Sequence, residues 1–397
     1  MFTLIKNETI KLLKRTKTLV TFIAFLLLTV LITFSTYKMI ENNKKWQDPD
    51  YKIQMAQENI NRYKADKTSS DVDKDYQNQI DELIKNEEAN IEQYKLEKEQ
   101  GKVDWKVTVN KTIEDSKNLL KDETLTKESK ESIQQQLDLN EYYIANNIEP
   151  NDNVFNAYNA LGTIIMILGS IFLAIGLAIF ASDMVSGEYT PPTMKVLLIQ
   201  PVSRGKVLFS KFISIALTCV TLIVSVEILT FLFVGVFFGF GSSNYPVVVG
   251  KKFYFDKIVS SNAAPQIKEI LGSSHIAPIW KVTLQGVLLQ ILFIIAVVAF
   301  VFLISTVMKS SMLSMSLSNV TIVALFIIPN LSHSIKKVMP YCFITYGNSY
   351  ALLDGSLNMG YNTPFITPLS ASLVMSIWIV VCYLISHFVF VKKDVLI

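Results

Sequence analysis

Six blocks of apolar residues divide the chain, and each is too long for a core strand. They cover about residues 19–37, 157–181, 212–238, 282–307, 312–329 and 369–391. A helix of about 20 mostly apolar residues crosses the hydrocarbon of a bilayer, so the pattern predicts six transmembrane helices. The basic start and first block also resemble a signal peptide. No small-residue cleavage pattern precedes Tyr37, however, so this block is expected to remain as a span.

Residues 38–156, between the first two blocks, are rich in Lys, Glu, Asp, Gln and Asn. Apolar residues recur there at heptad-like spacings, which favours paired helices with narrow apolar stripes. The three stripes are Ile80, Ile84, Ile91 and Tyr94, with Glu87 interrupting; Val109, Ile113 and Leu120; and Ile133, Leu137 and Ile144. Gly101 and Lys102 suit a turn, and Thr126 suits a helix start. We expect a helical hairpin or small bundle, and the alternative is a partly disordered charged linker.

Two further patterns concern how the helices pack. Residues 1–17 read as a basic amphipathic helix, with Phe2, Ile5, Leu12 and Leu13 able to share one face, so the segment is expected to lie in the membrane interface. The alternative is a charged flank of the first span. In the second block, glycines recur every seven residues, which predicts close packing on one face. They are Gly162, Gly169 and Gly176.

Composition and motifs argue against an enzyme. Half of the 397 residues are hydrophobic, and the three cysteines and three histidines form no regular framework or ligand cluster. Gly250-Lys251 lacks the first glycine and the hydroxyl residue of a phosphate-binding loop, and no metalloprotease or nucleophile-elbow motif is found. The sequence therefore predicts no catalytic residue, no metal site and no cofactor in this chain, and nothing in it points to nucleic acid.

Basic residues give the expected orientation. With the N-terminus in the cytosol, the inner segments hold about 12 Lys and Arg against about 4 Asp and Glu, as cytoplasmic segments do. Residues 38–156 hold about 18 basic and about 26 acidic residues, so they are placed outside. Six spans then put both termini in the cytosol. The loop of about residues 240–281, which includes Lys251, Lys252 and Lys257, fits this orientation least well.

The most informative segment is the inner loop at 182–211. Pro191 and Pro192 can open a helix, and Pro201 ends it after about two turns. The loop resembles the coupling loop of type-2 ATP-binding-cassette (ABC) permeases, in an ordered match that also includes Val202, Ser203 and Lys211. The residues expected to bind a partner are Glu188, Thr193, Lys195, Leu197, Leu198, Pro201 and Arg204. Pro192 stands where the family usually has a glycine, so a stiffer turn is expected. The C-terminal residues 390–394 also resemble the family's C-terminus.

The resemblance implies an all-α membrane protein with three parts. Residues 1–37 are the interfacial helix and first span, 38–156 an extracellular helical hairpin or coiled coil, and 157–397 five further spans with the coupling loop. It implies a permease subunit of an exporter in a bacterial cell membrane, partnered by cytosolic ABC ATPase subunits that bind ATP and Mg, and by a second permease, identical or paralogous. Peptides, antimicrobials, lipids and ions are all possible cargoes. The alternative is a non-transporting scaffold or sensor whose outer coiled coil binds a partner.

One ionisable residue, Glu227, lies in the middle of a span. An intramembrane carboxylate is costly and by default marks a functional site, so Glu227 is a candidate for the transport path. The alternative is a protonated or hydrogen-bonded packing residue. Asn319 and His387 are expected mainly to link helices.

Overall fold

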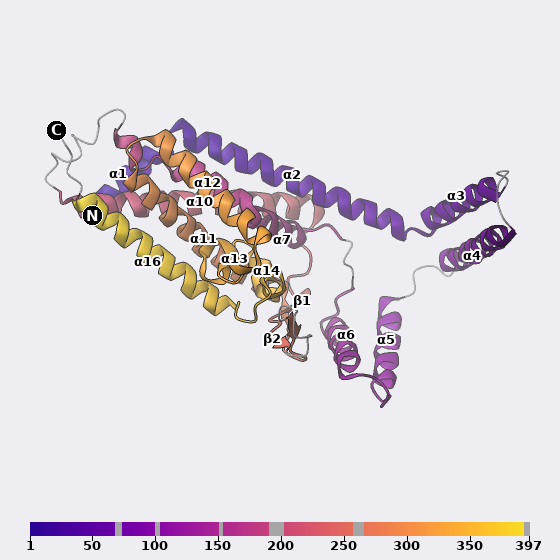
Figure 1. Ribbon diagram of the computed structural model, residues 1–397. Coiled ribbons are helices and arrows are strands. Elements are labelled where there is room, and N and C mark those ends of the chain that lie inside the picture. The colour runs from indigo at the N-terminus through magenta and orange to yellow at the C-terminus, as the bar shows by residue number, and fades with distance from the viewer. Residues whose placement is uncertain (68–73, 100–103, 151–153, 190–201, 257–265, 393–397) are drawn as a thin grey trace. The chain divides into compact units, whose positions relative to one another are not determined.

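The computed structural model describes the chain except for residues 68–73, 100–103, 151–153, 190–201, 257–265 and 393–397. The chain divides into two compact units, whose elements are labelled in Figure 1. Unit 1 combines Met1–Thr33 with Asn156–Ile397, and unit 2 is Phe34–Phe155.

Among the described residues, six helical segments are long and apolar enough to cross a membrane. They are α2 (Thr16–Gln47), the run α7–η1–α8 that begins at Ala157, α10 (Arg204–Phe238), α11 (Ile279–Val307), α12 (Ser311–Leu331) and α16 (Pro368–Lys392). Each contains the apolar block predicted for it. The expected all-α membrane protein with six spans is therefore confirmed.

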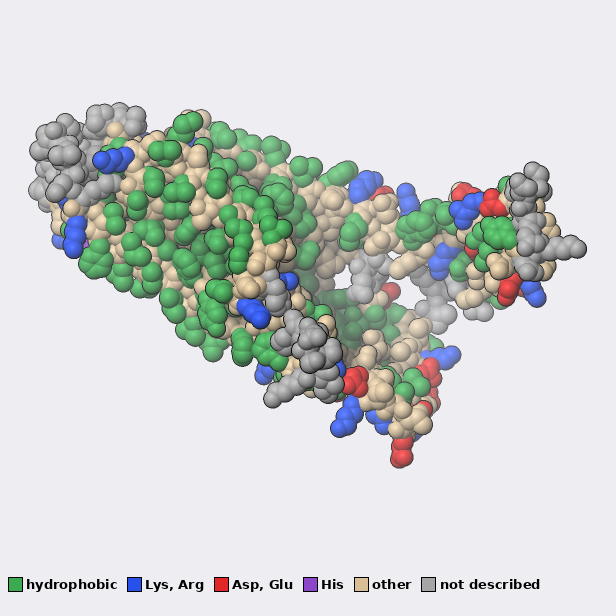
Figure 2. Space-filling view, in the orientation of Figure 1, with side chains coloured by type: hydrophobic (Ala, Val, Ile, Leu, Met, Phe, Trp, Pro, Cys, Tyr) green, Lys and Arg blue, Asp and Glu red, His purple; other side chains and the backbone are tan. Residues whose placement is uncertain are grey.

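Helix α11 is the central helix of unit 1. It contacts α7, α8, α10, α12 and α16, and the side chains of Ala296, Val297 and Phe302 are completely shielded. In contrast, α2, α12 and α16 expose large apolar side chains such as Leu313 and Leu373. Hydrophobic side chains cover the face of these helices seen in Figure 2. A surface this apolar suits hydrocarbon contact rather than water.

The second span contains a π-helical turn that the sequence did not predict. Helix α7 (Ala157–Ile167) continues through η1 (Leu168–Phe172) into α8 (Leu173–Ala181). Gly169, in the π-turn, packs directly on the backbone of Gly347, so a Cβ added at Gly169 would lie only 2.0 Å from the Gly347 carbonyl oxygen. The predicted close packing at this glycine is confirmed.

The segment between α10 and α11 is not a simple loop. β1 (Pro246–Val249) pairs antiparallel with β4 (His275–Pro278), and β2 (Phe253–Asp256) with β3 (Gln266–Glu269). These strands were not predicted, because four residues are too few to establish an alternating pattern.

The segment between α12 and α16 packs back into the helical bundle. It contains α13 (His333–Lys336), η3 (Met339–Tyr341), η4 (Phe343–Tyr346), α14 (Ser349–Asp354) and α15 (Ser356–Tyr361). Helix α14 contacts α7 and α11, and η4 contacts α11 and α16. Phe343 and Tyr346 are buried, and the Trp378 indole N–H donates to the Tyr341 carbonyl at 2.9 Å. This segment therefore forms part of the core of unit 1.

Unit 2 contains two helical pairs, whereas a single hairpin was one of the expected forms. Helix α3 (Pro49–Lys67) packs on α4 (Lys74–Glu99), and α5 (Trp105–Leu119) packs on α6 (Lys127–Ala145). Ile60 and Ile91 are buried between α3 and α4. Glu87, which interrupts the apolar stripe, accepts a hydrogen bond from Asn59 Nδ2 at 2.9 Å. Thr126 caps α6 as expected, and the turn predicted at Gly101 and Lys102 lies outside the described residues.

The N-terminal helix α1 (Phe2–Leu13) packs against α10. Leu12 is buried, while Phe2 and Leu13 are exposed. The position of α1 in the membrane interface stays a prediction. The Ser214 hydroxyl donates to the Ile5 carbonyl at 3.0 Å, which ties the two helices together.

Candidate functional site

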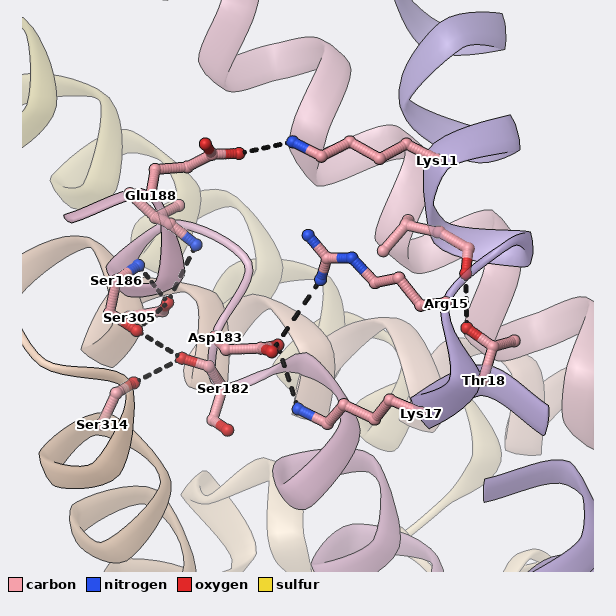
Figure 3. A network of polar contacts seen from close by, with 12 residues as sticks. Lys11, Arg15, Lys17, Thr18, Ser182, Asp183, Ser186, Glu188, Ser305 and Ser314 are labelled. Carbon is pink, nitrogen blue, oxygen red and sulfur yellow. Dashed lines mark hydrogen bonds and ion pairs between the residues drawn. The ribbon is translucent and has the colours of Figure 1, made fainter. Parts of the chain in front are cut away.

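The second span ends in a compact turn that serine side chains stabilise. After α8 ends at Ala181, the chain turns into the short helix η2 (Ser186–Tyr189). The Ser305 hydroxyl of α11 accepts from the backbone N–H groups of Val185 and Ser186, both at 3.1 Å. Ser314 of α12 donates to the Ser182 carbonyl at 2.6 Å. These bonds satisfy backbone groups that the end of a helix leaves without partners, and they join the turn to α11 and α12 (Figure 3).

The same turn carries an acidic residue that pairs with the N-terminal region. Asp183 lies 3.0 Å from the Lys17 ammonium and 3.8 Å from the Arg15 guanidinium. Figure 3 shows both basic side chains reaching Asp183 from the junction of α1 and α2. All three groups are partly exposed, so each contact contributes modestly to stability.

A second ion cluster, more deeply buried, surrounds Glu188. Its Oε1 accepts from Lys211 of α10 at 2.8 Å and from Lys11 of α1 at 2.9 Å. Lys211 also donates to Glu8 Oε2 at 3.0 Å. Only 4% of Glu188 and 1% of Lys211 is exposed. We call Glu8, Lys11, Glu188 and Lys211 the anchor cluster.

The anchor cluster is balanced in charge, with two carboxylates and two ammonium groups. Taking a charge out of water is unfavourable unless a partner compensates for it, so removing one member leaves the others destabilised. The four groups come from α1, from η2 and from α10. The cluster therefore fixes the N-terminal helix and η2, which precedes residues 190–201, to the same point on α10.

The start of α10, which follows residues 190–201, is held against α16. Arg204, the first residue of α10, donates from Nη1 to the Val391 carbonyl of α16 at 3.5 Å. A Cβ at Gly205 would come within 2.6 Å of His387 Cε1, so α10 begins in close contact with α16. The described residues on either side of residues 190–201 are therefore packed against other helices of unit 1.

The predicted partner-binding residues fall into two groups. Glu188 and Arg204 are described, and they lie at opposite ends of the segment. The others lie outside the described residues: Thr193, Lys195, Leu197, Leu198 and Pro201. Arg204 is exposed, whereas Glu188 points inward and contacts Lys11 and Lys211. Its direct contact with a partner protein stays a prediction.

Glu227 lies far along α10 from the anchor cluster and makes a buried pair with α11. Gln290 Nε2 donates to Glu227 Oε1 at 2.8 Å, and only 3% of Glu227 and 0% of Gln290 is exposed. Among the described residues, Glu227 Oε2 and Gln290 Oε1 have no hydrogen-bond partner. A proton on Glu227 would let Oε2 donate to the Gln290 oxygen, and the acid and amide would then satisfy each other.

The other intramembrane polar groups behave differently from each other. Asn319 Nδ2 donates to the Met315 carbonyl of its own helix at 2.9 Å, so the expected link to a neighbouring helix is not made through this group. His387 of α16 does contact α10, through Gly205. In the described part of the chain, no three His, Cys, Asp or Glu side chains gather closely enough to hold a metal ion.

Several residues that hold η2 and the turn before it were not predicted from the sequence. Glu8, Asp183, Ser305 and Ser314 were not singled out, and Lys11 was counted only as a charge on an interfacial helix. One usable signal was present: Glu8 is the only acidic residue among positions 1–17. An acid placed in a basic segment beside a membrane suggests a specific cationic partner.

The whole chain fits one protein family. The family model described as ABC-2 family transporter protein matches residues 2–395, which includes both units and both ends of the anchored segment. No curated protein matches the chain.

Proposed function

Because this chain belongs to the ABC-2 family of transporter proteins, we propose that it is the membrane-spanning subunit of an exporter whose ATPase is a separate protein. The observation that carries the proposal is the contact between the residues on either side of residues 190–201. Glu188 before the segment and Lys211 after it are joined at 2.8 Å in a buried cluster. A segment held in this way can transmit a force instead of absorbing it.

In this proposal the ATPase docks on residues 190–201 from the cytosol. ATP and Mg bind to the ATPase and not to this chain. When two ATPase subunits close, they move the docked segment. The anchor cluster passes this movement to α10. The serine contacts of Ser305 and Ser314 pass it to α11 and α12. The helical bundle thereby switches its transport path from opening on one side of the membrane to opening on the other.

The residues of the docking segment divide by role. Leu197 and Leu198 supply the apolar contacts with the ATPase. Lys195 and the exposed Arg204 supply polar contacts, and Thr193 and Pro201 set the shape of the short helix. We assign Glu188 a positioning role, because its carboxylate is already engaged by two lysines.

The transport path is formed together with a second permease, identical or paralogous. Both termini of this chain lie in the cytosol of a bacterial cell. Outward movement of a peptide, an antimicrobial, a lipid or an ion fits such a subunit. For Glu227 we propose helix pairing rather than the transport path. Its burial and its contact with Gln290 support this assignment.

The experiment is affinity purification of the tagged chain from its own membranes in mild detergent. The proposal predicts that an ABC ATPase co-purifies and that the complex hydrolyses ATP. The alternative, a scaffold whose unit 2 binds a partner, predicts a complex that lacks an ATPase. Recovery of the intact chain without any ATPase, after cross-linking in the membrane, would contradict the proposal.

A further inference from the structure

A pocket of about 370 Å³ lies in unit 1, where α12 ends and α16 begins. Its volume is within the range of small-molecule sites. Five aromatic side chains line it, from three separate segments: Phe255, Tyr341, Tyr346, Tyr361 and Phe365. The transport proposal does not use this pocket.

The charge of the pocket comes from one lysine. Lys337 is the only charged side chain among the described lining residues, and it is exposed. No carboxylate of the described residues pairs with it. Asp256, next to lining residue Phe255, is itself paired with Lys268 at 2.8 Å. An anionic group entering the pocket would therefore meet a cation and no opposing negative charge.

The remaining polar lining consists of neutral groups. Burial raises the pKa of Tyr346 to about 12, and burial also raises the pKa of Tyr361, so both phenols stay uncharged. Ser370, Thr363 and Asn362 add hydroxyl and amide groups. These neutral groups do not repel an anion, and their hydroxyl and amide groups can donate hydrogen bonds to its oxygens.

The pocket lies where the candidate span α12 ends and α16 begins, the level at which lipid headgroups would meet acyl chains. Lys337 follows the end of α12, and Val374 lies six residues into α16. At 1.5 Å per residue, Val374 is about 9 Å below the start of that helix. Tyrosines gather at this level in membrane proteins, and lysines near helix ends extend toward the headgroups.

The wall of the pocket continues onto an apolar helix face. On α16, Leu373 and Ile377 are 56% and 60% exposed, next to the lining residue Val374. An acyl chain could follow this face while its headgroup stays at Lys337. A second pocket, of about 250 Å³, is lined by residues of α1, α2 and α10, including Leu13 and Ser225. Its described lining has no charged residue, so it offers no comparable partner for a phosphate.

We propose that this pocket binds one anionic glycerophospholipid, with the phosphate at Lys337 and an acyl chain along α16. A lipid fits this site better than a soluble anion does. Lys337 can bind the phosphate, and the aromatic walls and the adjoining apolar face of α16 can contact the acyl chain. Trp378, which donates to the Tyr341 carbonyl, holds the wall of the pocket against α16.

The test is native mass spectrometry of the purified full-length chain in a neutral detergent, titrated with phosphatidylglycerol or phosphatidylcholine. The parent should retain phosphatidylglycerol in preference to phosphatidylcholine. Lys337→Gln should weaken phosphatidylglycerol binding about tenfold, the effect expected for one charge-assisted hydrogen bond. Lys336→Gln is the matched control, because it removes the same charge one position away and does not line the pocket.

Two further arms identify the ligand. Val374→Trp should fill the pocket and reduce lipid binding while Lys337 remains. Free glycerol phosphate, measured by calorimetry, should bind much more weakly than the lipid, because it lacks the acyl chain. Equal lipid binding by the Lys337 and Lys336 variants would overturn the proposal, and so would glycerol phosphate binding as tightly as the lipid.

Discussion

Glu188 precedes residues 190–201 and Lys211 follows them in the sequence, and the two side chains meet in a buried ion pair at 2.8 Å. The pair links η2, which precedes residues 190–201, to α10, which follows them. It also recruits α1 through Lys11 and Glu8. The cluster therefore joins α1, η2 and α10.

The first prediction concerns this pair. Lys211→Met leaves Glu188 and Glu8 without their buried cation, so the free energy of unfolding should fall by about 3–5 kcal/mol. The measurement is unfolding of the purified protein in detergent. Lys206→Met is the control, because Lys206 is exposed on the same helix and its loss should change the free energy by less than about 0.5 kcal/mol. Equal effects of the two variants would show that the pair is not a structural anchor.

The second prediction concerns the contact between Gly169 and Gly347. Gly169→Ala places a methyl group where the Gly347 carbonyl lies, so the backbone must move and the free energy of unfolding should drop by about 1–3 kcal/mol. Gly360→Ala is the matched control, since nothing lies within 4 Å of the added Cβ. Thermal unfolding of both variants should show a lower midpoint for Gly169→Ala alone. A normal midpoint for that variant would contradict the close packing.

The third prediction concerns Glu227. Glu227→Gln keeps a side chain of the same shape that can still pair with Gln290, so stability and transport should stay near those of the parent. Glu227→Leu leaves the buried Gln290 amide without its partner and should cost about 1–3 kcal/mol. Transport assays in vesicles decide the role. A glutamine variant that assembles normally but no longer transports would place Glu227 on the path.

The fourth prediction concerns orientation in the membrane. A cysteine replacing the exposed Ala89 should react with an impermeant thiol reagent in intact cells, and one replacing Lys206 should not. The distribution of basic residues requires this pattern. Cys342 is only partly buried, so the experiment needs a Cys342→Ser background. The opposite labelling pattern would reverse the topology.

The six spans could be predicted from the sequence because a bilayer requires long uninterrupted apolar helices. Their observed bounds differ from the predicted ones mainly at polar ends, where α2 continues to Gln47 and α10 begins as early as Arg204. Hydropathy marks the hydrocarbon layer, and these helices extend beyond it.

The anchor cluster could not be predicted from the sequence, although residues 182–211 were singled out as the segment of interest. Lys11 and Glu188 are 177 positions apart, and Lys211 and Glu8 are 203 apart. A single sequence gives no information on which distant charges meet. The π-turn at Leu168–Phe172 was also missed, and its Gly169 packs on Gly347, 178 positions away in the sequence.

The central claim is that residues 190–201 dock into a separate ATPase. The most direct measurement replaces Leu197 and Leu198 with Asp together, then determines co-purification with the ATPase and stimulation of ATP hydrolysis. The change removes apolar burial and adds charges that are unfavourable to desolvate, so both signals should be lost while the variant unfolds at the parent's temperature. Arg204→Glu should weaken the complex less if Arg204 lies at an exposed rim. A double variant that folds, binds and stimulates like the parent would contradict the account.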